Sequence, residues 1–413
     1  MSTSASDATS TTSVRELDQL FGALSPQAAA FPTDALIGRM LDAGEGISDL
    51  VFSPGRPPQV EQHGELTPVA LTGLTTLTAD HTAVIARHLV NGQAQAVRAL
   101  RDQGACDLSF ILGTRARFRV NVFRQRGTFA IVMRVIATKV PTLEELGLPP
   151  YLKQIASLKS GIVLVTGPTG SGKSSTLAAM IDLINETRAE HIITIEDPVE
   201  FLHEHKKGTV HQRELHSDTP TFALALRAAL RQAPKVILVG EMRDRETMEI
   251  ALTAAETGHL VLSTLHTIDA SRTVDRIIGA FDVGDQQAIR IRLAATFRAF
   301  ISQRLVPRKG GGRLPLLEIL TSTLRTRDYI EKGDSEGRSL LDAMRDGALD
   351  GMQTFDGEIE RLVRGGVITG AVGLLYATNA ANLRVMMADV KLDDEPAPAS
   401  NTIEGLEAGL ISQ

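Results

Sequence analysis

The sequence contains one cysteine, no tryptophan and only 4% aromatic residues among its 413 residues. The lone cysteine, Cys106, excludes an intrachain disulfide and a cysteine-based zinc site. We interpret it as a small packing residue at the start of a strand. The scarcity of aromatic side chains disfavours a base-stacking platform, and the net charge of −6 argues against nucleic-acid binding by charge alone. We therefore expect no nucleic-acid partner.

Long apolar runs and targeting signals are also missing. The first residues, MSTSASDATSTTS, lack the cationic and apolar regions of a secretory signal. No apolar run approaches the ~20 residues that are needed to cross a bilayer. We expect a cytoplasmic protein that does not insert into a membrane itself, so that any membrane association must come through a partner.

The pattern along the chain predicts two folded domains between two tails. Residues 1–30 begin Ser/Thr-rich and are expected to be poorly ordered, and residues 392–413 form a polar tail of the same kind. Residues 31–145 read as a compact α+β domain. In residues 146–282 strands and helices alternate, which is typical of a mostly parallel, doubly wound α/β sheet. Residues 283–391 contain only helical patterns.

Apolar spacing places the elements of the second domain. The expected strands are residues 161–166, 191–196, 235–240 and 260–264. In the last segment one apolar helical stripe is formed by Ile289, Leu293, Phe297, Phe300 and Ile301. Thr369 and Asn379 are the expected N-caps of the last two helices.

One strand of the first domain, residues 115–122, alternates apolar and basic residues. Its apolar side chains would point one way, and those of Arg117 and Arg119 would point the other. A second strand, residues 129–136, carries Arg134 among apolar residues. Two interpretations stay open on spacing alone: a solvated face of an antiparallel sheet, or an arginine row that meets phosphate.

The strongest motif is GPTGSGKS at residues 167–174, which fits G-x-x-x-x-G-K-[ST]. It follows an apolar strand and precedes a good helix, residues 174–185, which is the context that the motif requires. Lys173 would reach the β- and γ-phosphates of ATP, and Ser174 would ligate Mg²⁺. The predicted nucleotide-binding residues are Gly167, Pro168, Thr169, Gly170, Ser171, Gly172, Lys173, Ser174 and Ser175.

Three further strands end on polar side chains. The stretch KVILVGEMRD ends its strand on Glu241, with a glycine where many nucleotide hydrolases have aspartate, and the run EDPVE ends on Glu200. Because carboxyl ends of parallel strands converge on one crevice, both carboxylates are expected to serve one magnesium and one water. Which of them is the general base stays open, and so does a simple strand-ending role for Glu196 or Asp197. His266 is either a γ-phosphate sensor or a structural histidine.

The motifs GPTGSGKSS, TIEDPVEF, VILVGEMRDRET and TAAETGHLVLSTLHT occur in the order and at the spacing of a known family. Over about residues 35–385 the chain resembles the type IV pilus retraction (twitching motility) ATPases, the PilT/PilU family of type II/IV secretion ATPases. The resemblance implies a PAS-like N-terminal domain, a RecA-like P-loop domain and a ring-shaped homo-hexamer that hydrolyses Mg-ATP. It implies that Glu200 and Glu241 are essential, and that Arg119 and Arg134 reach the nucleotide between domains or across a subunit boundary.

The resemblance also implies partners and competing functions. The motor would act on an inner-membrane pilus platform protein, peripherally at that membrane, and its PilU-like stretches favour an accessory motor beside a paralogous retraction ATPase. A pilus-extension or type II secretion ATPase is the alternative, disfavoured because one cysteine cannot build the usual tetracysteine zinc insert. A nucleotide-gated scaffold with negligible turnover and a DNA translocase are alternatives of other classes.

Overall fold

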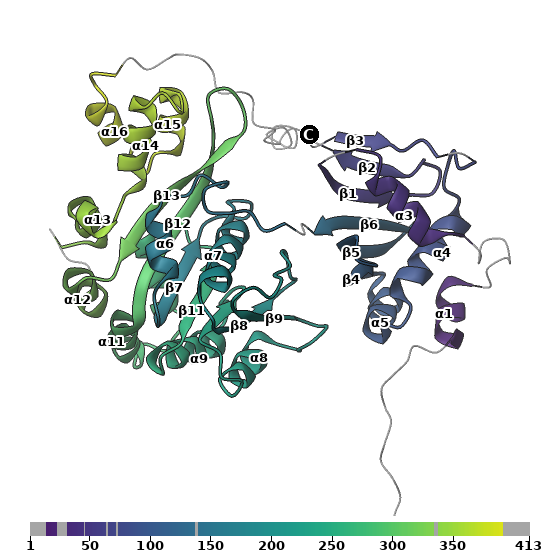
Figure 1. Cartoon of the computed structure of the whole chain (residues 1–413), viewed down its shortest axis with the longest axis horizontal. Coiled ribbons are helices and arrows are strands. Elements are labelled where there is room, and N and C mark those ends of the chain that lie inside the picture. The colour runs from purple at the N-terminus through teal and green to yellow at the C-terminus, as the bar shows by residue number, and fades with distance from the viewer. Residues whose placement is uncertain are drawn as a thin grey trace, which may run out of the picture. The chain divides into compact units, whose positions relative to one another are not determined.

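The computed structural model describes residues 14–22, 31–44, 46–62, 65–71, 73–136, 139–333 and 338–390. The chain divides into two compact units, residues 1–139 and residues 140–413, each with its own sheet and its own core (Figure 1). The fold class is α/β, with a β-rich unit preceding a larger one.

The first unit is a six-stranded antiparallel sheet in the order β3-β2-β1-β6-β5-β4. Its strands are β1 (Ile47–Phe52), β2 (Gln59–Gln62), β3 (Glu65–Pro68), β4 (Ala105–Leu112), β5 (Ala116–Gln125) and β6 (Thr128–Ile136). Its helices are α1 (Val14–Phe21), α3 (Thr33–Leu41), α4 (Ala79–Val90) and α5 (Ala94–Gln103). Apolar residues of these helices and of one sheet face form a continuous core. The other sheet face is therefore available for polar side chains.

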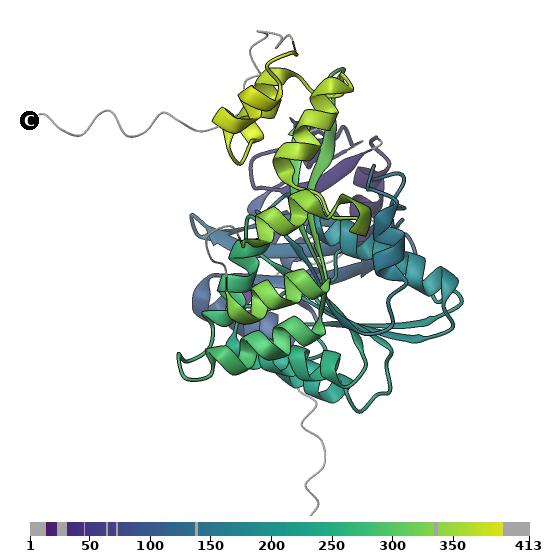
Figure 2. The ribbon, with the colours of Figure 1, turned by 90° about the vertical axis from the view of Figure 1, so that its left-hand side faces the viewer.

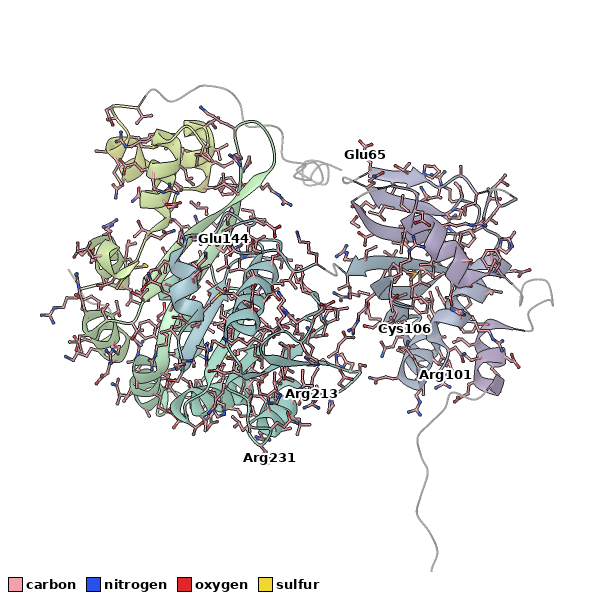
Figure 3. The ribbon with its side chains drawn as sticks, viewed as in Figure 1. Glu65, Arg101, Cys106, Glu144, Arg213 and Arg231 are labelled. Carbon is pink, nitrogen blue, oxygen red and sulfur yellow. The ribbon has the colours of Figure 1, made fainter. Side chains whose placement is uncertain are left out.

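The predicted alternation along the basic strand is confirmed by β5. Phe118 and Val120 are fully buried on the core face, whereas Arg117 is half-buried and Arg119 is exposed on the opposite face. Cys106 lies on β4 inside this unit, where burial raises the pKa of its thiol to about 11 (Figure 3). The interpretation of Cys106 as a packing residue is confirmed.

The expectation of a poorly ordered N-terminus is wrong for residues 14–21, which form α1. Leu17 and Phe21, four residues apart on one helix face, are buried in the first core, and the Phe21 ring lies 4.8 Å from that of Phe129. The Ser/Thr-rich composition before the helix concealed this short apolar stripe. The predictions for residues 1–13, 23–30 and 392–413 concern segments outside the described residues.

The second unit is a seven-stranded sheet in the order β13-β12-β7-β11-β10-β8-β9, parallel except for β13. Its strands are β7 (Gly161–Thr166), β8 (His191–Glu196), β9 (Thr209–Glu214), β10 (Val236–Val239), β11 (Leu260–Leu265), β12 (Phe297–Pro307) and β13 (Arg313–Thr321). The four predicted strands are confirmed to within one residue at each end.

Helices cover both faces of this sheet. One core joins the sheet to α8 (Phe222–Ala229), α9 (Arg245–Glu256), α10 (Ala270–Ile278) and α11 (Gln286–Thr296), and the other joins it to α6 (Tyr151–Ala156) and α7 (Lys173–Thr187). Alternate residues of β7, such as Leu164 and Val165, belong to the two different cores. The prediction of a doubly wound parallel sheet is confirmed.

The prediction of only helices after residue 283 is wrong, because β12 and β13 form an antiparallel pair there. The helix α11 ends at Thr296, so Phe297, Phe300 and Ile301 lie on β12 instead of on one helical stripe. The strand is buried on both sides and packed between β7 and β13. A strand buried on both faces reads as a continuous apolar run, which periodicity cannot separate from a helix.

The remaining helices follow the hairpin. They are α12 (Leu324–Lys332), α13 (Leu340–Asp346), α14 (Phe355–Arg364), α15 (Gly370–Tyr376) and α16 (Ala380–Met386), with a short 3-10 turn at Ala348–Asp350. The last three pack on Val306 and Leu316 of β12 and β13 and lie at the top of Figure 2. Thr369 and Asn379 cap α15 and α16 as predicted. No helix in the described part of the chain is long and apolar enough to cross a membrane.

Candidate nucleotide-binding and catalytic site

The phosphate loop connects β7 to α7, and its glycines are required by its geometry. Gly167 has φ +144° and Gly172 has φ +89°, values that residues with a Cβ rarely adopt. A Cβ on Gly167 would lie 2.3 Å from the carbonyl oxygen of Gln303, so the loop also passes too close to β12 for any side chain there. The loop therefore forms a tight turn directly before the N-terminus of α7, as the motif predicts.

Gln303 on β12 braces this loop. Its side-chain amide donates to the carbonyl oxygen of Ser171 at 2.7 Å and accepts from the hydroxyl of Thr176 at 2.8 Å. Only 3% of Gln303 is exposed. Sequence reasoning missed this residue because β12 itself was not predicted.

The ammonium group of Lys173 lies across the loop. Its Nζ donates to the carbonyl oxygens of Gly167 at 2.9 Å and Pro168 at 3.0 Å, and the residue is only 8% exposed. Burial lowers the pKa of Lys173, while the charges of Glu200 and Glu241 oppose that change. The charges of the predicted lysine and of the two predicted carboxylates therefore influence one another.

Strand order explains why these groups meet. The four neighbouring parallel strands β7, β11, β10 and β8 end at the phosphate loop, His266, Glu241 and the Glu200 segment respectively. The Glu241 side chain is 12% exposed and forms an ion pair with Arg243, Nε to Oε2 at 2.7 Å. The Nε2 atom of His266 lies 3.5 Å from the same oxygen. These three side chains, together with Arg276, line a cavity of about 220 Å³.

Glu196, the last residue of β8, has a different environment from Glu200, which lies four residues after the strand. Its carboxylate accepts hydrogen bonds from the Thr194 hydroxyl at 2.6 Å and the Gln212 amide at 3.2 Å. Burial raises the pKa of Glu196. Its contacts are with the sheet, which fits the strand-ending interpretation, whereas Glu200 is exposed.

The residues of the loop fit an anion, whereas a magnesium ion would need ligands from outside the protein as well. The Oγ atom of Ser171 is buried without a hydrogen-bond partner among the described residues. It lies close to Gly167, where a Cβ would be only 2.7 Å from this oxygen. The described ranges contain no group of three or more His, Cys, Asp or Glu that could hold a metal ion. Of the predicted magnesium ligands, Ser174 and Glu241, only one is a carboxylate, and phosphate oxygens and water would have to complete the shell.

A second cavity, of about 320 Å³, lies against the first half of the loop. Its lining is Pro168, Thr169, Gly170, Ser171, Ile268, Arg304, Leu305, Arg313 and Tyr376. Arg304 is fixed there, since its Nη1 donates to the Tyr376 carbonyl oxygen at 2.6 Å and its guanidinium lies 3.8 Å from the centre of the Phe355 ring. This pocket was not predicted from the sequence, because its two arginines lie on β12 and β13, which were not predicted as strands.

The two predicted arginines lie together on the polar face of the first unit's sheet. Arg119 on β5 is directly opposite Arg134 on β6, and Arg134 is directly opposite Asp49 on β1. The Nε atom of Arg134 donates to Oδ1 of Asp49 at 3.0 Å. The arginine row predicted from alternation is therefore present, and Asp49 at its end had no role predicted from the sequence.

Comparison with known proteins decides the family. The model of the type II/IV secretion system protein family matches residues 75–327, which is more than half of the chain. The chain belongs to the type II/IV secretion ATPases. Within this family, the type IV pilus retraction ATPase PilT of Pseudomonas aeruginosa is 44% identical over 79% of this chain and 93% of its own length.

Two further relatives agree. The type IV pilus ATPase PilU of the same organism is 40% identical over 85% of this chain and 90% of its own length. The crystal structure of the pilus retraction motor PilT with bound ADP matches with a TM-score of 0.77 at 40% identity. The matched region covers 86% of this chain and 99% of the PilT chain. The resemblance drawn from the four motifs is confirmed.

Proposed function

We propose that this chain is an Mg-ATP-hydrolysing motor that powers type IV pilus retraction as a homo-hexamer. The observation that carries the proposal is the strand order, which places the ends of β7, β10 and β8, followed by the phosphate loop, Glu241 and Glu200, at one edge of the sheet, in a chain 44% identical to a PilT over 93% of that protein's length. In this proposal the second unit is the RecA-like ATPase domain and the first is PAS-like. The motor works in the cytoplasm, at the inner membrane, on a pilus platform protein.

The second unit binds the nucleotide in this proposal. Backbone N–H groups of residues 167–175 and the N-terminus of α7 surround the phosphates, and Lys173 exchanges its two carbonyl partners for phosphate oxygens. Ser174 and Glu241 would hold magnesium, which neutralises phosphate charge when it is bound. One of the two carboxylates, Glu200 or Glu241, accepts the proton of the attacking water. His266, whose Nε2 atom lies 3.5 Å from Oε2 of Glu241, would sense the γ-phosphate.

The first unit supplies positive charge for the transition state. Arg119 and Arg134 are exposed and carry permanent charge on planar groups that bind phosphate oxygens in pairs. These arginines would reach the terminal phosphoryl group between domains or from a neighbouring subunit, and hydrolysis would change the angle between the two domains of each subunit. Closure passed around a ring would turn the platform protein.

Phosphate release by the purified chain tests the enzymatic step. The wild-type chain is expected to turn over, and Glu241→Gln is expected to lose turnover by about 10²–10⁴-fold while still binding ATP. Glu246→Gln is the matched control, because Glu246 lies at the start of α9 with an exposed ion pair to Arg227. Absence of any Glu241-sensitive turnover, with or without a paralogous motor, would favour the nucleotide-gated scaffold.

Deletion of the gene tests the direction of the motor. Retraction predicts pili that are made but stay extended. Absent pili would refute retraction and support an extension or secretion ATPase.

A further inference from the structure

Three charged residues cross the polar face of the first unit's sheet in one row. Asp49 on β1, Arg134 on β6 and Arg119 on β5 are directly opposite one another in the strand register. Opposite residues of antiparallel strands point to the same face, with Cβ atoms about 4.5–5.5 Å apart. One carboxylate and two guanidinium groups therefore share a small area.

The members of this row differ in exposure. Asp49 is 4% exposed, whereas 68% of the Arg134 side chain is open to solvent. Within the described residues, the Asp49 carboxylate has one hydrogen-bond partner, Nε of Arg134. A buried carboxylate is costly unless a cation accompanies it, so this contact constrains both side chains.

The contact uses only one edge of the guanidinium group. Nε–H is taken by Asp49, and the two terminal NH₂ groups of Arg134 have no hydrogen-bond partner in the described part of the chain. Because the group is planar, fixing one edge sets the direction of the other, which is the edge that binds phosphate oxygens in a fork. Asp49 also offsets the repulsion that Arg119, one strand away, exerts on Arg134.

We infer that Asp49 is a positioning residue, which holds the free edge of Arg134 ready for the terminal phosphoryl group of ATP. This inference rests on the proposed function, since it names what prepares an arginine for catalysis. Asp49 touches no reacting atom in this account and acts through Arg134 alone. A purely structural ion pair would instead stabilise the sheet whether or not the arginine has a second partner.

A double-mutant cycle in the full-length oligomer separates these roles. Asp49→Asn is expected to lower kcat by about 10- to 100-fold, the size expected from a small misplacement of a catalytic group, without changing ADP affinity. In an Arg134→Ala background the same change should have no further effect on kcat. Asp107→Asn is the matched control and should leave kcat unchanged. Asp107 lies on the same sheet and also accepts a cross-strand hydrogen bond, from Asn121 at 3.2 Å.

A second measurement does not depend on turnover. The ratio of affinities for the non-hydrolysable ATP analogue AMP-PNP and for ADP reports contact with the third phosphate, and Asp49→Asn should lower that ratio about tenfold. If the wild-type chain bound nucleotide but did not hydrolyse it, the proposed function would fail and this ratio would still decide the inference.

Three results would overturn the inference. The first is a wild-type kcat together with a wild-type affinity ratio in Asp49→Asn. The second is an equal fall in kcat when Asp49→Asn is made in the Arg134→Ala background, which would show that Asp49 acts independently of Arg134. Wild-type kinetics and an unchanged ratio in Arg134→Ala would remove the role of the arginine together with that of Asp49.

Discussion

Lys173 and Glu241 of the second unit differ in burial from the two predicted arginines of the first unit. In the second unit Lys173 is buried and bonded to two carbonyl oxygens, and Glu241 is nearly buried between Arg243 and His266. In the first unit Arg119 and Arg134 extend into solvent. Groups that are buried and partnered on all sides hold one geometry before the ligand arrives, whereas the terminal NH₂ groups of exposed arginines stay hydrated until a ligand replaces the water. This difference suits nucleotide binding by the second unit and stabilisation of transition-state charge by the arginines of the first unit.

Lys173→Ala is the most severe test of the buried half. It removes the charge that meets the phosphates and leaves the carbonyl oxygens of Gly167 and Pro168 without their donor. We expect ADP affinity and turnover to fall by at least about 10³-fold, because a buried charge-assisted contact is lost. Calorimetric titration with ADP measures this. Lys159→Ala, an exposed lysine paired with Glu190, is the control. Unchanged ADP affinity would contradict the assignment of the loop.

Arg119→Ala tests the exposed half and should separate rate from affinity. If Arg119 meets charge that develops only in the transition state, kcat should fall by roughly 10²-fold while ADP affinity stays within about twofold. Steady-state phosphate release and ADP titration on the same preparation measure the two quantities. The control is Arg101→Ala, an exposed arginine of α5 that pairs with Asp102. Wild-type kinetics would return Arg119 to the solvated-face interpretation.

The same contrast explains what the sequence could predict. The loop and the strand ends were predictable because a motif fixes the loop and the parallel strands carry clear apolar runs. Arginine alternation gave the polar face of β5 in the same way. Gln303 and Arg304 were missed because β12, buried on both faces, has no period of its own. The pairing of Asp49 with Arg134 was not predicted because the two residues are 85 positions apart in the chain, and no local pattern marks such a pair.

The last prediction concerns stability instead of turnover. It involves Glu318 on β13, a carboxyl group of the second unit that is only 3% exposed. Its Oε1 accepts the backbone N–H of Ala270, the first residue of α10. Burial raises the pKa of Glu318 to about 7; Asp269 and Asp356 add to the rise, while the Ala270 N–H and Arg304 oppose it. This carboxyl group is therefore ionised at a cost in stability that the exposed arginines of the first unit do not incur.

Glu318→Gln should abolish that cost and keep the hydrogen bond to Ala270, since an amide oxygen also accepts. Between the usual glutamate pKa of 4.5 and the raised value of about 7, the folded chain keeps a proton that the unfolded chain releases. Wild-type stability should therefore decline as pH rises through this window. The unfolding free energy of Glu318→Gln minus that of wild type should therefore be roughly 2–3 kcal/mol larger at pH 8 than at pH 5, which means that the variant gains relative stability at the higher pH. Urea unfolding at both pH values measures the difference, with Glu246→Gln as an exposed control. Parallel pH profiles for wild type and Glu318→Gln would show that the packed unit holds this carboxylate without penalty, and the contrast between the units would then be one of geometry alone.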